Sequence, residues 1–282
     1  MTVKFIAEIS SNHNKNIERC FKLIETAAAI GCDGVKFQLF KIDQLFHSSV
    51  LEKSEMHRNR REWELPVEFL PRLKQACDDN GIDFSCTPFY LEAVEELKPY
   101  VDFYKVASYE LLWLDLFRKI RDAGKPVVLS TGMANIVEVE RAVQVLKKDI
   151  RNIIVLHCVS SYPAPLEECN LQAIQTIRNR IGGITGVGWS DHTVDPFIIQ
   201  QAILPPNYAD MVEFHLDLEG DGVEYDIGHC WLPDQAAKMI EYARLIPAIA
   251  GHGEKVPAIS ESPEIVWRAD PTDGLRPMRG IR

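Results

Sequence analysis

Residues 127–157 read VVLSTGMANIVEVERAVQVLKKDIRNIIVLH and contain one complete strand–helix–strand unit. Two short apolar runs, 127–130 and 153–157, have the length of buried strands, and the residues between them have the spacing of an amphipathic helix. Both runs are continuously apolar rather than alternating, which is typical of parallel strands covered on both faces. This stretch therefore predicts a parallel sheet with a helix packed against it.

The same unit recurs along the chain. Further apolar runs predict strands at residues 3–9, 34–37, 84–87, 103–107, 186–189 and 211–215. Amphipathic stretches predict helices near residues 17–30, 68–80, 91–97, 111–123, 136–146, 171–180, 195–202 and 233–249. Eight strand–helix repeats in about 250 residues are the count and length of a (β/α)8 TIM barrel. We therefore expect an α/β barrel domain over residues 1–255 and a short irregular tail over residues 256–282. An open doubly wound sheet is the alternative, although no GxGxxG motif follows the first strand.

Composition and charge exclude several classes of partner. The chain has 282 residues, a net charge of −10 and 46% hydrophobic residues. Proteins that bind nucleic acid normally present a basic face, so we expect no nucleic-acid partner. No signal-like segment and no apolar run of membrane-spanning length is evident, so we expect no membrane association. The seven cysteines are scattered without a CxxC pair, which predicts reduced thiols in a cytoplasmic protein.

Polar side chains gather at or just past the C-terminal ends of the predicted strands. In a barrel these ends share one face, which carries the catalytic groups. A charged residue that ends an apolar strand is costly unless it is paired, so this repetition predicts an active site. The residues are Glu8, Lys36, Gln38, Thr87, Lys105, Ser108, Glu110, Ser130, Thr131, Ser160, Tyr162, Ser190, His192, Glu213 and His215. The long charged connection at residues 41–66 is either a mobile lid over this face or a solvated loop.

Lys36 and Lys105 end the second and fourth predicted strands. Each can hold an anionic group such as phosphate or carboxylate. The remaining donors would be the hydroxyl groups of Thr87, Ser108, Ser130 and Ser190. Two alternatives stay open, because the lysines can instead pair with buried carboxylates such as Glu8 or Glu110, or one lysine with a lowered pKa can form a Schiff base.

His192 and His215 close the seventh and eighth predicted strands, so both imidazoles are expected at the same barrel mouth. Two imidazoles without cysteine can hold a divalent metal and leave positions open for water or substrate. Strand alternation puts Glu213 on the same side as His215, as a support for this histidine or as a further ligand. The histidines without comparable context are expected to be structural or exposed; these are His47, His57, His157, His229 and His252.

Seven short motifs occur in order along the chain. They are AEI with NH at 7–9 and 12–13, VKFQ at 35–38, CTPF at 86–89, YKVAS with Glu at 104–108 and 110, STGM at 130–133, HC with YP at 157–158 and 162–163, and SDHT at 190–193. In this order they resemble the N-acetylneuraminate (sialic acid) synthase family over nearly the whole barrel. Members of that family usually carry a C-terminal antifreeze-like domain, and we expect this chain to comprise the barrel without it.

The resemblance implies that phosphoenolpyruvate condenses with an N-acyl aminosugar, such as N-acetylmannosamine, to give a sialic acid or related nonulosonate and phosphate. It implies a divalent metal, Mn2+ or Mg2+, held by His192 and His215, and by analogy a homodimer. The implied catalytic residues are Glu8, Lys36, Lys105, Glu110 and Asp226. The implied substrate contacts are Gln38, Thr87, Phe89, Ser108, Ser130, Ser160, Tyr162, Ser190 and Lys255. Ser160 replaces an asparagine that the family usually has near the phosphate.

Three other functions stay open at this point. The chain can be a phosphoenolpyruvate-dependent synthase for a different aldose, a Schiff-base aldolase that uses a lysine, or a barrel that binds a sugar without turnover. A chelator that abolishes activity would favour the metal-dependent reaction, whereas borohydride trapping with a keto acid would favour the aldolase.

Overall fold

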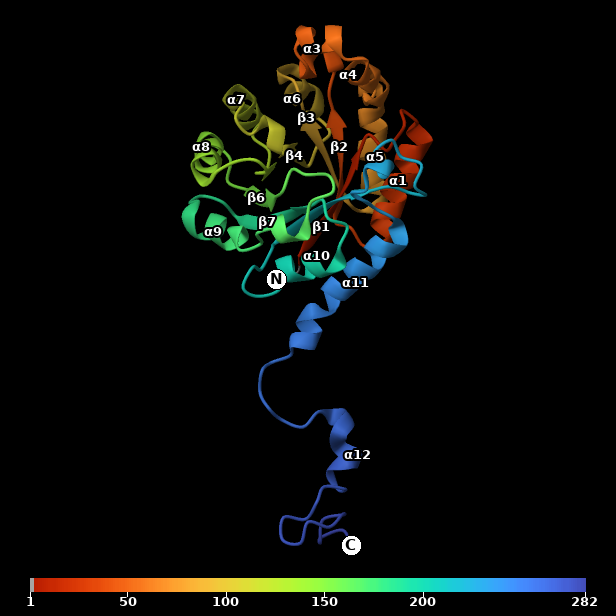
Figure 1. Ribbon diagram of the computed structural model, residues 1–282, viewed down its shortest axis with the longest axis vertical. Coiled ribbons are helices and arrows are strands. Elements are labelled where there is room, and N and C mark those ends of the chain that lie inside the picture. Colours follow the sequence, from red (N-terminus) through yellow and green to blue (C-terminus); the bar gives the residue numbers. More distant parts are fainter. Residues whose placement is uncertain (1–2) are drawn as a thin grey trace. The chain divides into compact units, whose positions relative to one another are not determined.

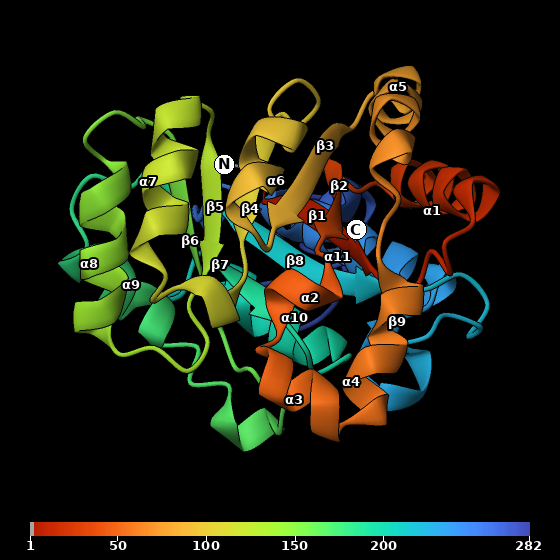
Figure 2. The same ribbon diagram turned by 90° about the horizontal axis from the view of Figure 1, so that it is seen from above.

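The computed structural model describes residues 3–282 and contains a closed parallel barrel (Figure 1, Figure 2). The strands pair in sequence order, and β8 returns to pair with β1, which closes the sheet. The barrel strands are β1 (Lys4–Ser10), β2 (Gly34–Leu39), β3 (Asp83–Pro88), β4 (Phe103–Val106), β5 (Val127–Ser130), β6 (Ile153–Cys158), β7 (Gly186–Asp191) and β8 (Met211–Leu216). The predicted (β/α)8 barrel is confirmed.

Helices connect successive strands and surround the sheet, as Figure 2 shows. The main helices are α1 (Ile17–Ala29), α5 (Leu70–Asn80), α6 (Leu91–Leu97), α7 (Leu114–Ala123), α8 (Ile136–Leu146), α9 (Ala173–Arg180), α10 (Pro196–Ile203) and α11 (Pro233–Ala250). Their ends follow local chemistry. The side chain of Asn16 accepts hydrogen bonds from the first turn of α1, and Asn135 forms a capping box with Glu138 at α8. Gly81 ends α5 in the left-handed region, at φ +69°.

Apolar side chains form two layers on the two faces of the barrel strands. The larger layer packs between the sheet and the helices. A small inner cluster consists of Ile6, Phe103, Val128, Leu156 and Met211. Because side chains alternate along a strand, the residue two positions after each inner apolar residue faces the same way. Lys105 therefore lies on the same face of β4 as Phe103, and Glu213 on the same face of β8 as Met211. The barrel interior is apolar at the level of Phe103 and Met211 and polar at the C-terminal ends of the strands, which we call the polar mouth.

Two parts of the chain are more ordered than the sequence indicated. The connection at residues 41–66 contains the short helices α2 (Ile42–Leu45), α3 (Ser48–Lys53) and α4 (Glu55–Asn59). An ion pair of 2.8 Å between Asp43 and Arg61 links residues near the two ends of this connection. A further strand that the sequence did not predict, β9 (Cys230–Trp231), pairs in parallel with β8.

The chain divides into two compact units after Arg244, and the second unit is Leu245–Arg282. Within it lie the turn Ile259–Glu261 and the short helix α12 (Ser262–Ile265). Asp270 organises its last residues, because the carboxylate accepts hydrogen bonds from the backbone N–H groups of Thr272 and Arg279 at 2.9 and 2.8 Å. The expected division at residue 255 stays a prediction. Within residues 3–282, no helix has both the length and the apolar character that crossing a bilayer requires.

Candidate active site

Two lysines and two glutamates form a buried ionic network at the polar mouth of the barrel. Lys36 of β2 pairs with Glu8 of β1, and its Nζ lies 3.7 Å from Glu213 Oε1. Lys105 of β4 approaches the same Glu213 oxygen at 3.1 Å and donates a hydrogen bond to Ser130 at 2.7 Å. All four charged residues are at most 4% exposed. Both lysines are therefore paired with carboxylates, and Glu213 is shared between them.

The network affects the pKa of Glu213 and the pKa of Lys36 differently. Burial raises the pKa of the Glu213 carboxyl, but Lys105 and Lys36 outweigh it and lower the pKa to about 2. Burial lowers the pKa of Lys36 to about 8. Attraction by Glu213 raises this pKa and repulsion by Lys105 lowers it, so the attraction compensates for only part of the effect of burial. Glu213 has two positively charged neighbours, whereas each lysine has another lysine near it besides its carboxylate. An anionic ligand would therefore complement the lysines, in competition with Glu213.

Hydroxyl groups and a backbone N–H surround this network at the ends of β4, β5 and β6. Ser108 accepts a hydrogen bond from Gly132 N at 3.0 Å, and its Oγ lies 3.2 Å from Cys158 Sγ. The Oγ of Ser160 is buried and has no hydrogen-bond partner within residues 3–282. A methyl group on Gly132 would overlap this oxygen, so glycine is required for the close approach. This corner combines small donors with an unsatisfied hydroxyl, as a phosphate or carboxylate subsite requires.

Glu110 and Glu8 differ in how well they are suited to proton transfer. Glu110 lies in a turn after β4, and burial raises its pKa to about 7. Its Oε2 has no hydrogen-bond partner in the described chain. Glu8 accepts a hydrogen bond at 3.2 Å from Gln38, which also donates to Ser10 at 2.9 Å. Glu110 can thus gain or lose a proton near neutral pH, whereas Glu8 is held in place by Lys36 and Gln38.

The two histidines predicted from the strand ends are brought together. Their ring centroids lie 5.4 Å apart, with the Tyr162 ring 4.3 Å from that of His192. His192 Nδ1 lies 2.7 Å from the carbonyl oxygen of Val159. An N–H donated there leaves Nε2 as the acceptor nitrogen. Burial lowers the pKa of His192 to about 4 and that of His215 to about 3, so both rings are neutral at pH 7, as metal binding requires.

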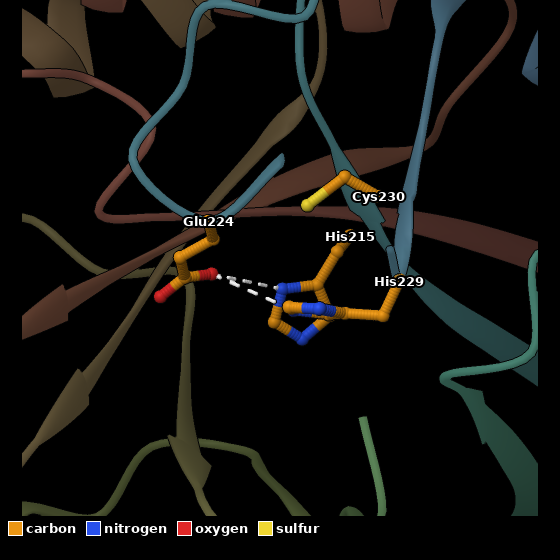
Figure 3. Close-up of side chains that lie close together, drawn as sticks. All are labelled: His215, Glu224, His229 and Cys230. Carbon is orange, nitrogen blue, oxygen red and sulfur yellow. Dashed lines mark ion pairs between the residues drawn. The ribbon is translucent and has the colours of Figure 1, made fainter. Parts of the chain in front are cut away.

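The structure adds two residues that the sequence did not point to, Glu224 and His229 (Figure 3). Glu224 Oε2 lies 3.4 Å from His215 Nδ1 and 3.7 Å from His229 Nε2. Donor atoms of these three residues and Cys230 lie within 4.8 Å of one another. The sequence indicated no context for His229 comparable to that of His192 and His215, whereas the structure places it beside His215 and Glu224. β9 causes the difference: its pairing places Cys230 beside His215, so His229 enters the site directly before this strand.

These residues fit a divalent metal. Within residues 3–282, His215 Nδ1 and Glu224 Oε2 are both buried and without a hydrogen-bond partner. Buried polar atoms are nearly always satisfied, so an unsatisfied imidazole nitrogen beside an unsatisfied carboxylate oxygen marks a site for a cation. Imidazole and carboxylate are ligands for zinc and other first-row metals. The sequence gives one signal in retrospect, since Glu224 and His229 follow the predicted ligand His215 within a single loop.

The remaining predicted residues differ in where they lie. Thr87 Oγ1 lies 3.5 Å from Lys36 Nζ, and Ser190 donates to Glu213 at 3.2 Å, so both belong to the ionic network. Phe89 packs edge-on against Phe40, with ring centroids 6.1 Å apart. Asp226 is exposed, in a turn that follows Glu224. Lys255 is exposed and belongs to the second unit. The roles of Asp226 and Lys255 stay predictions from the resemblance.

Comparisons with known proteins agree with this architecture. The model of the NeuB family matches residues 23–255. An uncharacterised protein of Methanocaldococcus jannaschii is 36% identical over 93% of this chain and 76% of its own length. The N,N'-diacetyllegionaminic acid synthase of Campylobacter jejuni is 32% identical over 92% of this chain and 81% of its own. The crystal structure of N-acetylneuraminic acid synthetase from Leptospira borgpetersenii, in complex with citrate, superposes with a TM-score of 0.81 at 30% identity, covering 94% of this chain and 90% of that one. The chain therefore belongs to the NeuB family.

Proposed function

We propose that this protein condenses phosphoenolpyruvate with the open-chain form of an N-acyl aminosugar such as N-acetylmannosamine. The product would be a sialic acid or a related nonulosonate, with phosphate released. Relatives named as synthases of N,N'-diacetyllegionaminic acid and pseudaminic acid support this class of reaction. The observation that carries the proposal is the buried pair of lysines beside a histidine cluster at one barrel mouth. The lysine pair suits the anionic substrate phosphoenolpyruvate, and the histidine cluster suits a metal ion that polarises the aldehyde of the sugar.

Phosphoenolpyruvate carries a phosphate and a carboxylate, and the lysines would bind both. Lys36 and Lys105 supply two positive charges in a site closed to water, where such charges act strongly. Ser108 and Ser130 would supply neutral hydroxyl donors, and the N–H of Gly132 holds Ser108 in place. Binding would displace Glu213 from at least one lysine, because this carboxylate already neutralises part of the positive charge of both. Held in this way, the donor presents its C3 atom to the acceptor.

The electron pair of the phosphoenolpyruvate double bond forms a bond between C3 and the aldehyde carbon of the sugar, which leaves cationic character at C2. The aldehyde oxygen gains the electron pair of its C=O π bond and takes up a proton, which the proton given up by water balances. Water then adds at C2 and gives up a proton, and the resulting hemiketal expels phosphate by C–O cleavage. Glu110 is suited to take the proton, since burial raises its pKa to about 7 and its Oε2 makes no hydrogen bond within residues 3–282. Glu8 would orient the water or the sugar, because Lys36 and Gln38 fix its position.

A divalent metal, Mn2+ or Mg2+, held by His192 and His215 would supply Lewis-acid polarisation of the aldehyde oxygen. The chain's own residues define the space around that oxygen. Tyr162 lies edge-to-face against the imidazole of His215, with ring centroids 6.1 Å apart. This aromatic ring would limit access of water to the histidines.

The test is a phosphate-release assay with phosphoenolpyruvate and a panel of N-acylated hexosamines, with Mn2+ or Mg2+ added and then chelated. We expect release to depend on one acceptor and on the metal. Lys105→Met should reduce kcat/KM at least a hundredfold, while Lys119→Met, on the outer helix α7, should match the wild type. Release without any acceptor, or none with any aminosugar or other aldose, would contradict the proposal.

One observation favours a second reaction. A lysine that forms a Schiff base needs a lowered pKa, and the pKa of Lys36 is lowered to about 8 by burial. Borohydride reduction in the presence of pyruvate, followed by mass spectrometry, separates the two reactions. A covalent adduct on Lys36 would support an aldolase, whereas an unmodified chain that still releases phosphate supports the condensation.

A further inference from the structure

We propose that His215, Glu224 and His229 form a metal site of two histidines and one carboxylate. The predicted pair of His192 and His215 would then be only part of the metal centre, and the loop between β8 and β9 would supply two further ligands. The proposal deepens the proposed function, since it names the groups that hold the metal of that reaction. It can be tested without the reaction.

The donor atoms are spaced as ligands of one ion. Metal–nitrogen and metal–oxygen bonds of about 2.1 Å, at angles between tetrahedral and octahedral, place neighbouring donors about 3.0–3.5 Å apart. Glu224 Oε2 lies 3.4 Å from His215 Nδ1 and 3.7 Å from His229 Nε2. Figure 3 shows both ring nitrogens directed to this one carboxylate oxygen. Only small movements are therefore needed to close the three atoms around an ion.

The two oxygens of Glu224 have different surroundings. Oε1 accepts a hydrogen bond from Ser10 at 2.6 Å, and the backbone N–H of Glu224 donates to Asn12 Oδ1 at 3.0 Å. Both contacts come from β1 and the turn that follows it, and they fix the side chain from that side. Oε2 is buried without a hydrogen bond within residues 3–282. One oxygen is thus committed to the protein, and the other is held free toward the histidines.

The loop that carries Glu224 is preorganised. Asp217 Oδ2 accepts hydrogen bonds from the N–H groups of Gly220 and Gly222 at 2.8 and 3.1 Å. Arg19 holds the other oxygen of Asp217 at 2.6 Å. A side chain at Gly222 would collide with Asn12 and Asp217. At its far end the loop is closed by β9, whose pairing with β8 fixes His229. Binding a cation here would cost little ordering of the chain.

Cys230 is the fourth member of the cluster, and we infer that it is not a ligand. Its Sγ lies 3.5 Å from Asn12 Nδ2, which can donate a hydrogen bond to it, and it belongs to β9 itself. The loop therefore adds one imidazole and one carboxylate to the strand-end histidines as donors. Such a set favours first-row transition ions such as Mn2+, Fe2+ or Co2+ over Mg2+, which prefers oxygen ligands and water.

A different arrangement of the same residues makes another prediction. Glu224 could accept the Nδ1–H of His215 and orient its ring, so that Nε2 of His215 binds the metal together with His192. In that case His229 contributes nothing to metal affinity. The distances favour the direct set, because a single orienting bond does not explain why His229 Nε2 approaches the same oxygen.

The experiment measures Mn2+ binding to the metal-stripped full chain by isothermal titration calorimetry, with no substrate present. We expect His229→Gln and Glu224→Gln each to weaken binding at least a hundredfold, and the control His252→Gln, in the exposed second unit, to leave it unchanged. Wild-type protein should bind Mn2+ at least tenfold more tightly than Mg2+. His229→Asn serves as a second variant, and circular dichroism confirms that each variant is folded. Binding of Mn2+ by either folded His229 variant within threefold of the wild type would overturn the proposal. A chain that binds Mn2+ as expected but releases no phosphate would contradict only the proposed reaction.

Discussion

Glu213→Gln is the sharpest test of the shared-carboxylate network, because it removes one charge and almost no volume. In the wild-type protein two buried lysines face this carboxylate, at 3.1 Å for Lys105 and 3.7 Å for Lys36. The amide cannot balance them, so Lys36 keeps only Glu8 as a partner and Lys105 loses the carboxylate that it contacts. Removal of one partner from a buried ionic network typically costs about 3–5 kcal/mol.

The pKa of Glu213 gives the same magnitude. Its lowering from 4.5 to about 2 corresponds, at about 1.4 kcal/mol for each pKa unit, to about 3 kcal/mol of stabilisation at pH 7. We therefore expect the free energy of unfolding in urea to fall by about 3 kcal/mol in the variant. Inorganic phosphate should raise the melting temperature of the variant more than that of the wild type, because the anion no longer competes with a carboxylate for the lysines.

The matched control is Glu140→Gln on the exposed face of α8, which should change stability by less than about 0.5 kcal/mol. Equal urea midpoints for Glu213→Gln and wild type would refute the claim that the carboxylate stabilises the lysines. An equal rise in melting temperature with phosphate in both proteins would refute the claim that Glu213 competes with an anion for Lys36 and Lys105.

Three further predictions follow from buried groups. Burial lowers the pKa of His13 to about 4, so the unfolded chain binds its proton first and stability falls as the pH drops from 6.5 to 4, by about 3 kcal/mol in total; urea midpoints of His13→Asn should depend less on pH, and parallel curves would show that His13 is not responsible. Asp191 accepts the indole N–H groups of Trp189 and Trp231 at 3.1 Å each. Asp191→Asn should therefore cost about 2 kcal/mol, measured by urea unfolding, and an unchanged midpoint would argue against this. Glu110→Gln should lower kcat at least a hundredfold and remove a pH dependence near 7 from the rate, and a variant with wild-type kcat would exclude Glu110 as the base.

The barrel could be predicted because its strands are continuous apolar runs bounded by glycine and proline. Each barrel strand begins and ends within a few residues of the predicted range. The strand-end rule then located the ionic residues and the first two histidines, since the C-terminal ends of parallel strands share one face. Pairing of the lysines with buried carboxylates could only be named as an alternative, with Glu8 or Glu110 as examples. Glu213 was not named as their partner, because sequence spacing does not tell which carboxylate reaches across the barrel.

The loop after β8 shows why the rest of the site was not predicted. β9 has two residues, too few for any periodicity, so nothing in the sequence indicated that His229 lies beside His215. Glu224 faces inward only because Asn12 and Ser10, far away in the sequence, hold it. Asp226, favoured by family resemblance, lies in the same loop but is exposed. Loop residues take their direction from tertiary contacts, and these are not encoded in local spacing.

The closure of the barrel through β1 and β8 also bears on how the protein is made. Glu8 pairs in register with His215, so the first and last barrel strands meet at the site itself. While the chain emerges from a ribosome, β1 would remain an unpaired edge, and Lys36 would lack Glu213, until β8 has been synthesised. The site would then form in the last step of folding, when the seam closes. Incomplete chains would lack both Glu213 and the full set of histidines, and only a closed barrel could retain a metal.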